Sequence, residues 1–116
     1  MIYASGEKRW YQNGKLHRDN DQPSVIHPYG DQIWYQYDNV HRDNDQPAII
    51  GFNGEQLWYQ NGYIHRDGPE GQQPAMICAN GDKYWYQKGE LRRDGNKSAC
   101  QKGKRHRDNM AQDNIQ

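Results

Sequence analysis

The chain is poor in the features by which a sequence usually declares a function. It has two cysteines, Cys78 and Cys100, a single phenylalanine and only 33% hydrophobic residues, with a mean hydropathy of −1.40. Two cysteines supply neither a disulfide framework nor a metal cluster, so we expect free thiols in a reducing compartment. No charged-then-apolar segment opens the sequence, and no apolar run is long enough to cross a membrane. The sequence therefore predicts a cytoplasmic protein without a membrane partner.

Net charge is absent as well, because 15 lysines and arginines balance 15 aspartates and glutamates. Without a positive field, little draws the chain to nucleic acid. The sequence holds no P-loop, GxSxG, HExxH or CxxC motif. The Asp-Asn-Asp tracts that begin at Asp19 and Asp43 lack the closing acid of a calcium loop, and we interpret them as solvated turns. We therefore expect no enzyme activity, no cofactor and no metal.

What the chain does have is a repeated aromatic pattern. Trp-Tyr-Gln, a turn and His-Arg-Asp follow one another from Trp10, Trp34 and Trp58, and from Trp85 with Arg92 in place of the histidine. The four tryptophans are 24, 24 and 27 residues apart. A fixed period of this length indicates one small structural unit stacked on copies of itself.

Each copy is interpreted as three short antiparallel strands joined by two tight turns. In the third copy the turns are two Asn-Gly dipeptides, at 53–54 and 61–62. Asn-Gly strongly favours a two-residue type I′ hairpin loop, in which both residues have positive φ. Loops of that length place Ile49 opposite Trp58, and Trp58 opposite His65.

The same register can be written for every copy, and it sorts the residues onto two faces. It places Val25 opposite Trp34 and Met76 opposite Trp85, and it gives each repeat tyrosine an aliphatic partner: Leu16, Val40, Ile64 and Leu91. A one-residue slip would move all of these residues to the wrong face. The sequence therefore predicts an all-β fold, a single elongated antiparallel β-meander of about ten to twelve short strands. We expect one face to carry a thin aliphatic and tyrosine core and the other a Trp-His stripe. Because both faces carry apolar residues, the sequence leaves open which of them is buried.

Departures from the pattern mark the loops and the ends. Tyr37-Asp38 replaces Asn-Gly in the second copy, which predicts a strained turn or another turn type. The insertion at 68–71 lengthens one connection, as in a surface loop. We expect one domain of about four and a half copies over residues 1–108, followed by a polar tail at 109–116.

The ring-rich strand, the Asn-Gly turn and the Pro-Ala-Ile-Ile run resemble a variant of the MORN repeat. More closely, residues 1–108 resemble the WYxNGxxHRxDxPA repeats seen in proteins of phages, giant viruses and some bacteria. The resemblance implies a MORN-like meander of stacked β-hairpins in one elongated, curved sheet that serves as an interaction scaffold, with no catalytic residues. It also implies a viral or phage protein that inhibits a host or defence enzyme in the host cytoplasm.

The aromatic and basic stripe is the candidate partner-binding surface, because Tyr, Trp and Arg are enriched where proteins bind proteins. Its residues are Trp10, Trp34, Trp58, Trp85, His17, His41, His65, Arg18, Arg42, Arg66 and Arg93. The structural alternative is that each imidazole packs on its cross-strand tryptophan and bonds backbone or aspartate. Each Arg-Asp pair would then form a local ion pair, or the aspartate would cap the loop in an Asx-turn. Histidines of successive copies lie too far apart to share one metal ion.

Three functions follow from this surface. The first is a non-enzymatic module for protein–protein interaction. The second is capture of a phosphate-bearing ligand, such as a nucleotide or single-stranded nucleic acid, along the arginine ladder. The third is a structural scaffold that self-associates through open edge strands. Net neutrality and the adjacent acids argue against nucleic acid, so we expect a protein partner.

Overall fold

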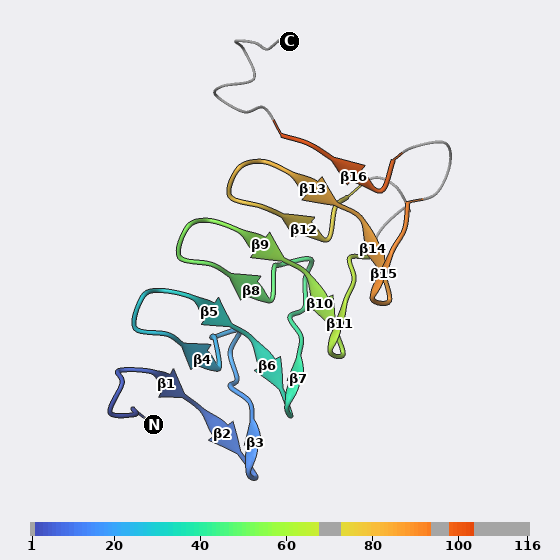
Figure 1. The fold of residues 1–116 in the computed structure, drawn as a ribbon. Helices are drawn as coiled ribbons and strands as arrows, with labels where there is room; N and C mark the ends of the chain where they lie inside the picture. The colour runs from blue at the N-terminus through green and yellow to red at the C-terminus, as the bar shows by residue number, and fades with distance from the viewer. Residues whose placement is uncertain (1, 68–72, 94–97, 104–116) are drawn as a thin grey trace.

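The computed structural model describes residues 2–67, 73–93 and 98–103 as an all-strand protein (Figure 1). In these residues it has sixteen strands of two residues each and no helix. The strands form one eight-stranded sheet and four two-stranded sheets, and every pairing is antiparallel. The predicted all-β hairpin architecture is therefore confirmed. Nothing in the described segments is a helix with the length and apolar character needed to cross a bilayer.

The copies are stacked along the long axis of the molecule, and its principal extents are 54 × 33 × 19 Å (Figure 1). The eight-stranded sheet, which we call the main sheet, has the order β1 (Lys8–Arg9), β4 (Val25–Ile26), β5 (Gln32–Ile33), β8 (Ile49–Ile50), β9 (Gln56–Leu57), β12 (Met76–Ile77), β13 (Lys83–Tyr84) and β16 (Cys100–Gln101). The two-stranded sheets, which we call the side hairpins, pair β2 (Tyr11–Gln12) with β3 (Lys15–Leu16), β6 (Tyr35–Gln36) with β7 (Asn39–Val40), β10 (Tyr59–Gln60) with β11 (Tyr63–Ile64), and β14 (Tyr86–Gln87) with β15 (Glu90–Leu91).

The chain passes from the main sheet to a side hairpin at the repeat tryptophan. The backbone N–H of Trp58 donates to the carbonyl of Ala75 in the following copy at 2.8 Å, and the Trp58 carbonyl accepts the N–H of His65 at 2.9 Å. The same pair of bonds forms at Trp10, Trp34 and Trp85. Each tryptophan therefore connects its own side hairpin to the next copy. The predicted single meander is in this way divided at the tryptophans into a main sheet and side hairpins.

Three hairpins of the main sheet, β4–β5, β8–β9 and β12–β13, are called the long hairpins here. Their turn differs from the predicted one, as the third copy shows. The N–H of Gly51 donates to the Glu55 carbonyl at 2.8 Å, and the N–H of Gly54 donates to the Gly51 carbonyl at 2.9 Å. Gly54 has a φ of 98°, whereas Asn53 does not take the left-handed conformation that a type I′ turn requires. The loop thus has three residues, a type I turn followed by a left-handed glycine.

Because of this longer loop, the predicted register of the long hairpins is wrong by one residue. The observed pairs are Val25 with Ile33, Ile49 with Leu57, and Met76 with Tyr84. In each pair the partner is the residue before the repeat tryptophan, whereas the sequence predicted the tryptophan itself. The tryptophans are released from this pairing, which leaves their amides for the next copy.

The turns of the side hairpins are the predicted two-residue type I′ loops. Asn61 and Gly62 both have positive φ, at 52° and 87°. Tyr37 and Asp38 form the same turn without a glycine, with φ of 47° and 72°. Of the two predicted alternatives, a strained turn or another turn type, the strained turn is confirmed. Every repeat tyrosine faces its predicted aliphatic partner: Tyr11 with Leu16, Tyr35 with Val40, Tyr59 with Ile64, and Tyr86 with Leu91.

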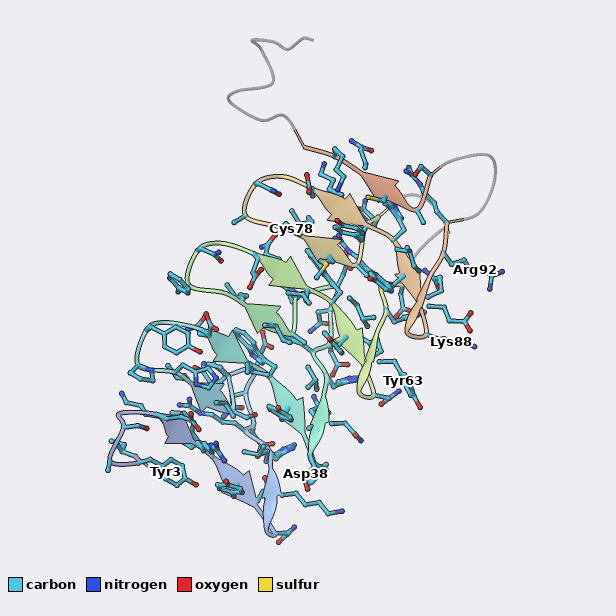
Figure 2. The ribbon with its side chains drawn as sticks, in the orientation of Figure 1. Tyr3, Asp38, Tyr63, Cys78, Lys88 and Arg92 are labelled. Atoms are coloured by element: carbon cyan, nitrogen blue, oxygen red, sulfur yellow. The ribbon has the colours of Figure 1, made fainter. Side chains whose placement is uncertain are left out.

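Contacts with the preceding copy hold the strained turn, with Asp38 at its tip (Figure 2). Asp38 Oδ1 accepts the N–H of Leu16 at 2.7 Å, and the Asp38 N–H donates to the Leu16 carbonyl at 3.0 Å. In the next copy the N–H of Gly62 donates to the Val40 carbonyl at 2.9 Å. The tip of each side hairpin is thus bonded to the hairpin before it.

The buried core lies on the tryptophan side of the sheet. The tryptophans at 34, 58 and 85 are 7%, 6% and 4% exposed, and the small residues Ser24, Ala48 and Ala75 are completely buried. The tyrosines of the side hairpins and their aliphatic partners are half-buried or exposed. The predicted aliphatic and tyrosine core is therefore wrong, because a single-layer sheet leaves one face without cover.

Both cysteines are free, as predicted, and both are half-buried. Burial raises the pKa of the Cys78 thiol above its usual range, and the nearby carboxylate of Asp82 raises it further. Cys78 lies at the start of the turn between β12 and β13 (Figure 2). The predicted loop at 68–71 and the polar tail at 109–116 lie outside the described residues.

Lys88 occupies the left-handed turn position that Asn13 and Asn61 hold in other copies, with φ of 50° against 52° for both asparagines. Its side chain is exposed, and asparagine tolerates this conformation better than lysine. We expect Lys88→Asn to raise the free energy of unfolding by about 1 kcal/mol, as measured by chemical denaturation. Lys15→Asn, at an exposed strand position, is the control and should not stabilise. An equal gain from both substitutions would contradict the strain argument.

Candidate functional site

The predicted site residues come together in one cluster per copy, but the guanidinium covers the tryptophan, not the imidazole. The Cζ atoms of Arg18, Arg42, Arg66 and Arg93 lie 3.7, 3.8, 3.9 and 3.7 Å from the ring centroids of Trp10, Trp34, Trp58 and Trp85, respectively. Each stack of this kind contributes about 0.5–2 kcal/mol. A guanidinium, and not the predicted imidazole, stacks on each indole, whereas the predicted bond from imidazole to aspartate does form, with the aspartate two residues later in the chain.

Each interior arginine also binds an aspartate of the preceding copy. Nε and Nη2 of Arg42 donate to the two carboxylate oxygens of Asp21 at 2.9 and 3.2 Å. Arg66 makes the same two bonds to Asp45, at 2.8 and 3.2 Å. Both pairs are bidentate, the geometry in which arginine binds a carboxylate most strongly. For Arg42 and Arg66 the predicted ion pair with the aspartate that follows in the chain is therefore wrong.

Two further bonds complete the contact between copies. Nη1 of Arg42 donates to the carbonyl of Pro47 at 3.0 Å, which fixes the guanidinium. The indole Nε1–H of Trp34 donates to the backbone carbonyl of Asp21 at 3.2 Å, and the equivalent bond in the next copy measures 3.1 Å. We call the set of a tryptophan, the arginine stacked on it and the aspartate of the preceding copy the clamp.

The backbone conformation brings the aspartate into the clamp. Asn20 and Asp21 have φ of 64° and 55°, and Asn44 and Asp45 repeat both values. Asparagine and aspartate tolerate this left-handed conformation because their short polar side chains can bond locally. The Asp-Asn-Asp tracts are therefore contacts between copies, and not merely the solvated turns that the sequence predicted.

The interior histidines have both ring nitrogens engaged. Nε2 of His41 lies 2.7 Å from Oδ1 of Asp43, and its Nδ1 accepts the backbone N–H of Asn61 at 3.0 Å. His65 makes both contacts at the same distances with its own partners. The ring thus links its own loop to the tip of the next side hairpin, and no lone pair is left for a ligand.

The histidine of the first copy differs from the others. His17 is 7% exposed, its Nε2 lies 2.7 Å from Asp19, and its ring stacks on Tyr37 with centroids 4.1 Å apart. Within the described residues its Nδ1 has no hydrogen-bond partner. The ring stack replaces the backbone bond that the interior histidines make.

This arrangement leaves little of the predicted stripe for a partner. The tryptophans from the second copy onward are buried, and each stacked guanidinium has one face covered by an indole. Arg42 and Arg66 each commit N–H groups on all three nitrogens to protein oxygens. The stripe residues hold the copies together, and their role in binding a partner stays a prediction.

Shallow hollows lie between successive copies beside the clamps. One of about 340 Å³ is bordered by Asp21, Trp34 and Arg42, and a similar one of about 330 Å³ by Asp45 and Arg66. Charges of both signs line them. Across the described ranges, no three His, Cys, Asp or Glu side chains are grouped as a metal ion would require.

The tyrosines are the exposed counterpart of the buried tryptophans. Tyr35, Tyr59 and Tyr86 are half-buried at equivalent positions of successive side hairpins. Burial raises the pKa of the Tyr59 phenol, and the neighbouring phenols of Tyr86 and Tyr35 raise it further. With the aliphatic residues opposite them, they form what we call the tyrosine face: Tyr35, Val40, Tyr59, Ile64, Tyr86 and Leu91. Their period was visible in the sequence, but their exposure was not.

Other exposed aromatic residues lie at the turns, where the sequence analysis missed them. Tyr29 and Phe52, at the tips of long hairpins, are 59% and 66% exposed and meet edge to face at 5.7 Å. Tyr63, near the tip of the third side hairpin, is 62% exposed (Figure 2). In the sequence, a large aromatic residue at an expected turn position could have indicated this exposure.

Comparison with protein-family models, with curated proteins and with solved structures gives no match for this chain. The resemblance to the MORN repeat therefore stays an expectation drawn from the sequence pattern. Function has to be argued from the geometry of the clamp and of the tyrosine face.

The first copy offers an internal control for the clamp. Arg18 stacks on its tryptophan and bonds the Pro23 carbonyl at 3.1 Å, as Arg42 bonds its own proline, but no described aspartate pairs with it. Replacement by lysine removes the stack at both positions, and the bidentate pair only at position 42. We expect Arg42→Lys to lower the free energy of unfolding by about 1 kcal/mol more than Arg18→Lys does, in chemical denaturation. Equal losses would show that the bond between copies contributes nothing.

The hydrogen bonds also predict histidine tautomers. Nδ1 of His41 and His65 accepts a backbone N–H, so the ring proton lies on Nε2 and is donated to aspartate. His27 is the control, since its Nδ1 lies 3.1 Å from Oε1 of Glu7 and should carry the proton. We expect ¹⁵N NMR spectra of the neutral rings to show the Nε2–H form for the first two and the Nδ1–H form for His27. The same tautomer at all three positions would contradict these contacts.

Proposed function

We propose that this chain is a non-enzymatic repeat module that binds a protein partner through the tyrosine face. One observation carries the proposal: a row of tyrosines with aliphatic partners stays half exposed, while the repeat tryptophans from the second copy onward are buried. Tyrosine suits an interface because its ring offers a large apolar area and its hydroxyl can bond a partner or water.

The length and continuity of the tyrosine face support this proposal. Tyr11, 45% exposed, continues the row into the first copy, and Leu91, at the fourth-copy end of the face, is 53% exposed. Contiguous apolar rows on a protein surface usually mark interaction sites. Repeat sheets present extended surfaces of this kind, and an extended surface fits a protein segment better than a small molecule.

The two alternative functions have less support from the geometry. The arginine ladder offers little to a phosphate, because Arg42 and Arg66 already bind aspartate and a backbone carbonyl. Self-association through edge strands is weakened at the first strand, because Ile2 pairs with Lys8 and covers that edge of β1.

A finer proposal rests on the resemblance to repeats of phage and giant-virus proteins. It holds that the partner is a host or defence enzyme and that the chain inhibits it in the host cytoplasm. The tyrosine face would then occupy a surface that the enzyme needs for its substrate or its assembly. Addition of the purified chain to the captured enzyme should lower its activity, and an unchanged rate would end this finer proposal.

Site-directed photo-crosslinking tests the tyrosine face. A benzophenone-bearing phenylalanine placed at position 59 should form a discrete protein adduct in cells that express the chain. The same group at position 52, at a long-hairpin tip, is the matched control for an exposed aromatic residue elsewhere, and it should not form that adduct. Excess unlabelled chain should compete the adduct away, whereas a folded Tyr35→Ser/Tyr59→Ser variant should not. Adducts at both positions, or at neither, would remove the tyrosine face from consideration.

A further inference from the structure

The clamp of the first copy lacks its aspartate. In the first copy Arg18 is held as its equivalents are, with Cζ 3.7 Å from the Trp10 centroid and Nη1 3.1 Å from the Pro23 carbonyl. Arg42 shows nearly the same values, 3.8 and 3.0 Å. Within the described residues, however, no carboxylate pairs with Nε or Nη2 of Arg18 and no carbonyl accepts from Nε1 of Trp10. Both side chains are half-buried.

The interior clamps show what these open donors are shaped to bind. In them, two N–H groups of an arginine and one of a tryptophan converge on a single aspartate residue. Asp21 receives all three, two on its carboxylate and one on its backbone carbonyl, with φ of 55°. Asp45 receives the same three. A free carboxylate ion would satisfy only the arginine, whereas an aspartate within a polypeptide satisfies all three donors.

We propose that Trp10 and Arg18 form a binding site for an aspartate-bearing segment of a partner protein. Arg18 needs no rearrangement, because the indole beneath it and the Pro23 carbonyl already fix its guanidinium. The Nε–H and Nη2–H donors, which we call the fork, are thus already in place. Preorganisation of this kind lowers the ordering cost of binding, and a bidentate charged pair is selective for planar carboxylates. Glutamate fits less well, because its extra methylene separates the carboxylate from the carbonyl that Trp10 would bind.

The partner in this site is not a second copy of the chain. Asp21 and Asp45 are already held by clamps of their own molecule. Three residues after the arginines of the third and fourth copies, where Asp21 and Asp45 stand in their copies, the sequence has Pro69 and Asn96. An amide cannot supply the two acceptor oxygens that the fork requires. The site lies apart from the tyrosine face and does not depend on it.

The test uses the full chain and a peptide with the sequence that fills the clamp of the second copy. The probe is the acetylated and amidated hexapeptide Asp-Asn-Asp-Gln-Pro-Ser, followed in ¹H–¹⁵N spectra. We expect saturable shifts of the Trp10 indole and Arg18 Nε–H signals, with the indole signals of Trp34 and Trp58 unmoved. A peptide with asparagine at its third position should bind at least about tenfold more weakly, because it loses a charged bidentate pair.

Protein variants separate the fork from its charge. Arg18→Lys keeps the positive charge but not the fork, and it should weaken binding of the aspartate peptide about tenfold. Arg92→Lys, the same change at an exposed position of the fourth copy, should leave the affinity unchanged. Absent shifts, equal binding of the two peptides, or equal binding by Arg18→Lys would overturn the proposal. So would a Trp10 shift on dilution of the chain alone, which would mean that a second copy fills the site. The comparison of the two peptides uses the unaltered chain, so it tests the proposal even if a protein variant does not fold.

Discussion

The arginine of the clamp is the contact on which this fold depends. A single-layer sheet has no second layer to bury its tryptophans, and in this chain a guanidinium supplies the cover. Arg42 lies on Trp34, bonds a carbonyl of its own loop and holds Asp21 of the copy before. Arginine can do all three because it is planar, weakly hydrated and rich in donors. The stack can therefore persist in a chain with only 33% hydrophobic residues.

Nearly every such contact joins one copy to its immediate neighbour. The amide of Trp58 bonds the following copy, its indole bonds the preceding one, and the ring of His65 bonds the tip of the next side hairpin. Stability in such a stack is a sum of nearest-neighbour terms, so interior copies are satisfied on both sides and the ends are not. In the first copy, the Nε and Nη2 groups of Arg18 are the donors that an aspartate of a neighbouring copy would have used.

The sequence predicted the parts of this fold that local chemistry decides. The type I′ turn at Asn61-Gly62 follows from two residues that tolerate positive φ, and the partner of Tyr59 follows from the turn. The other Asn-Gly dipeptide, at 53–54, forms a three-residue loop, because a dipeptide does not determine whether its asparagine turns left-handed. The aspartate that each arginine binds could not be predicted from the sequence either. Two aspartates follow Arg18 and Arg42 at short range, and only the stacking of copies decides which carboxylate meets which guanidinium.

The two kinds of aromatic residue are sorted by what their polar atoms need. The indole N–H groups of Trp34 and Trp58 each need one acceptor, and a carbonyl of Asp21 or Asp45 supplies it, so these two rings can be buried between copies. A tyrosine hydroxyl both donates and accepts, and it is most easily satisfied at the surface. The tryptophans that hold the copies together are therefore buried, even though tryptophan is in general enriched at protein–protein interfaces. We therefore propose that recognition falls to the rings that the stack does not use, and to the first-copy clamp that lacks its aspartate.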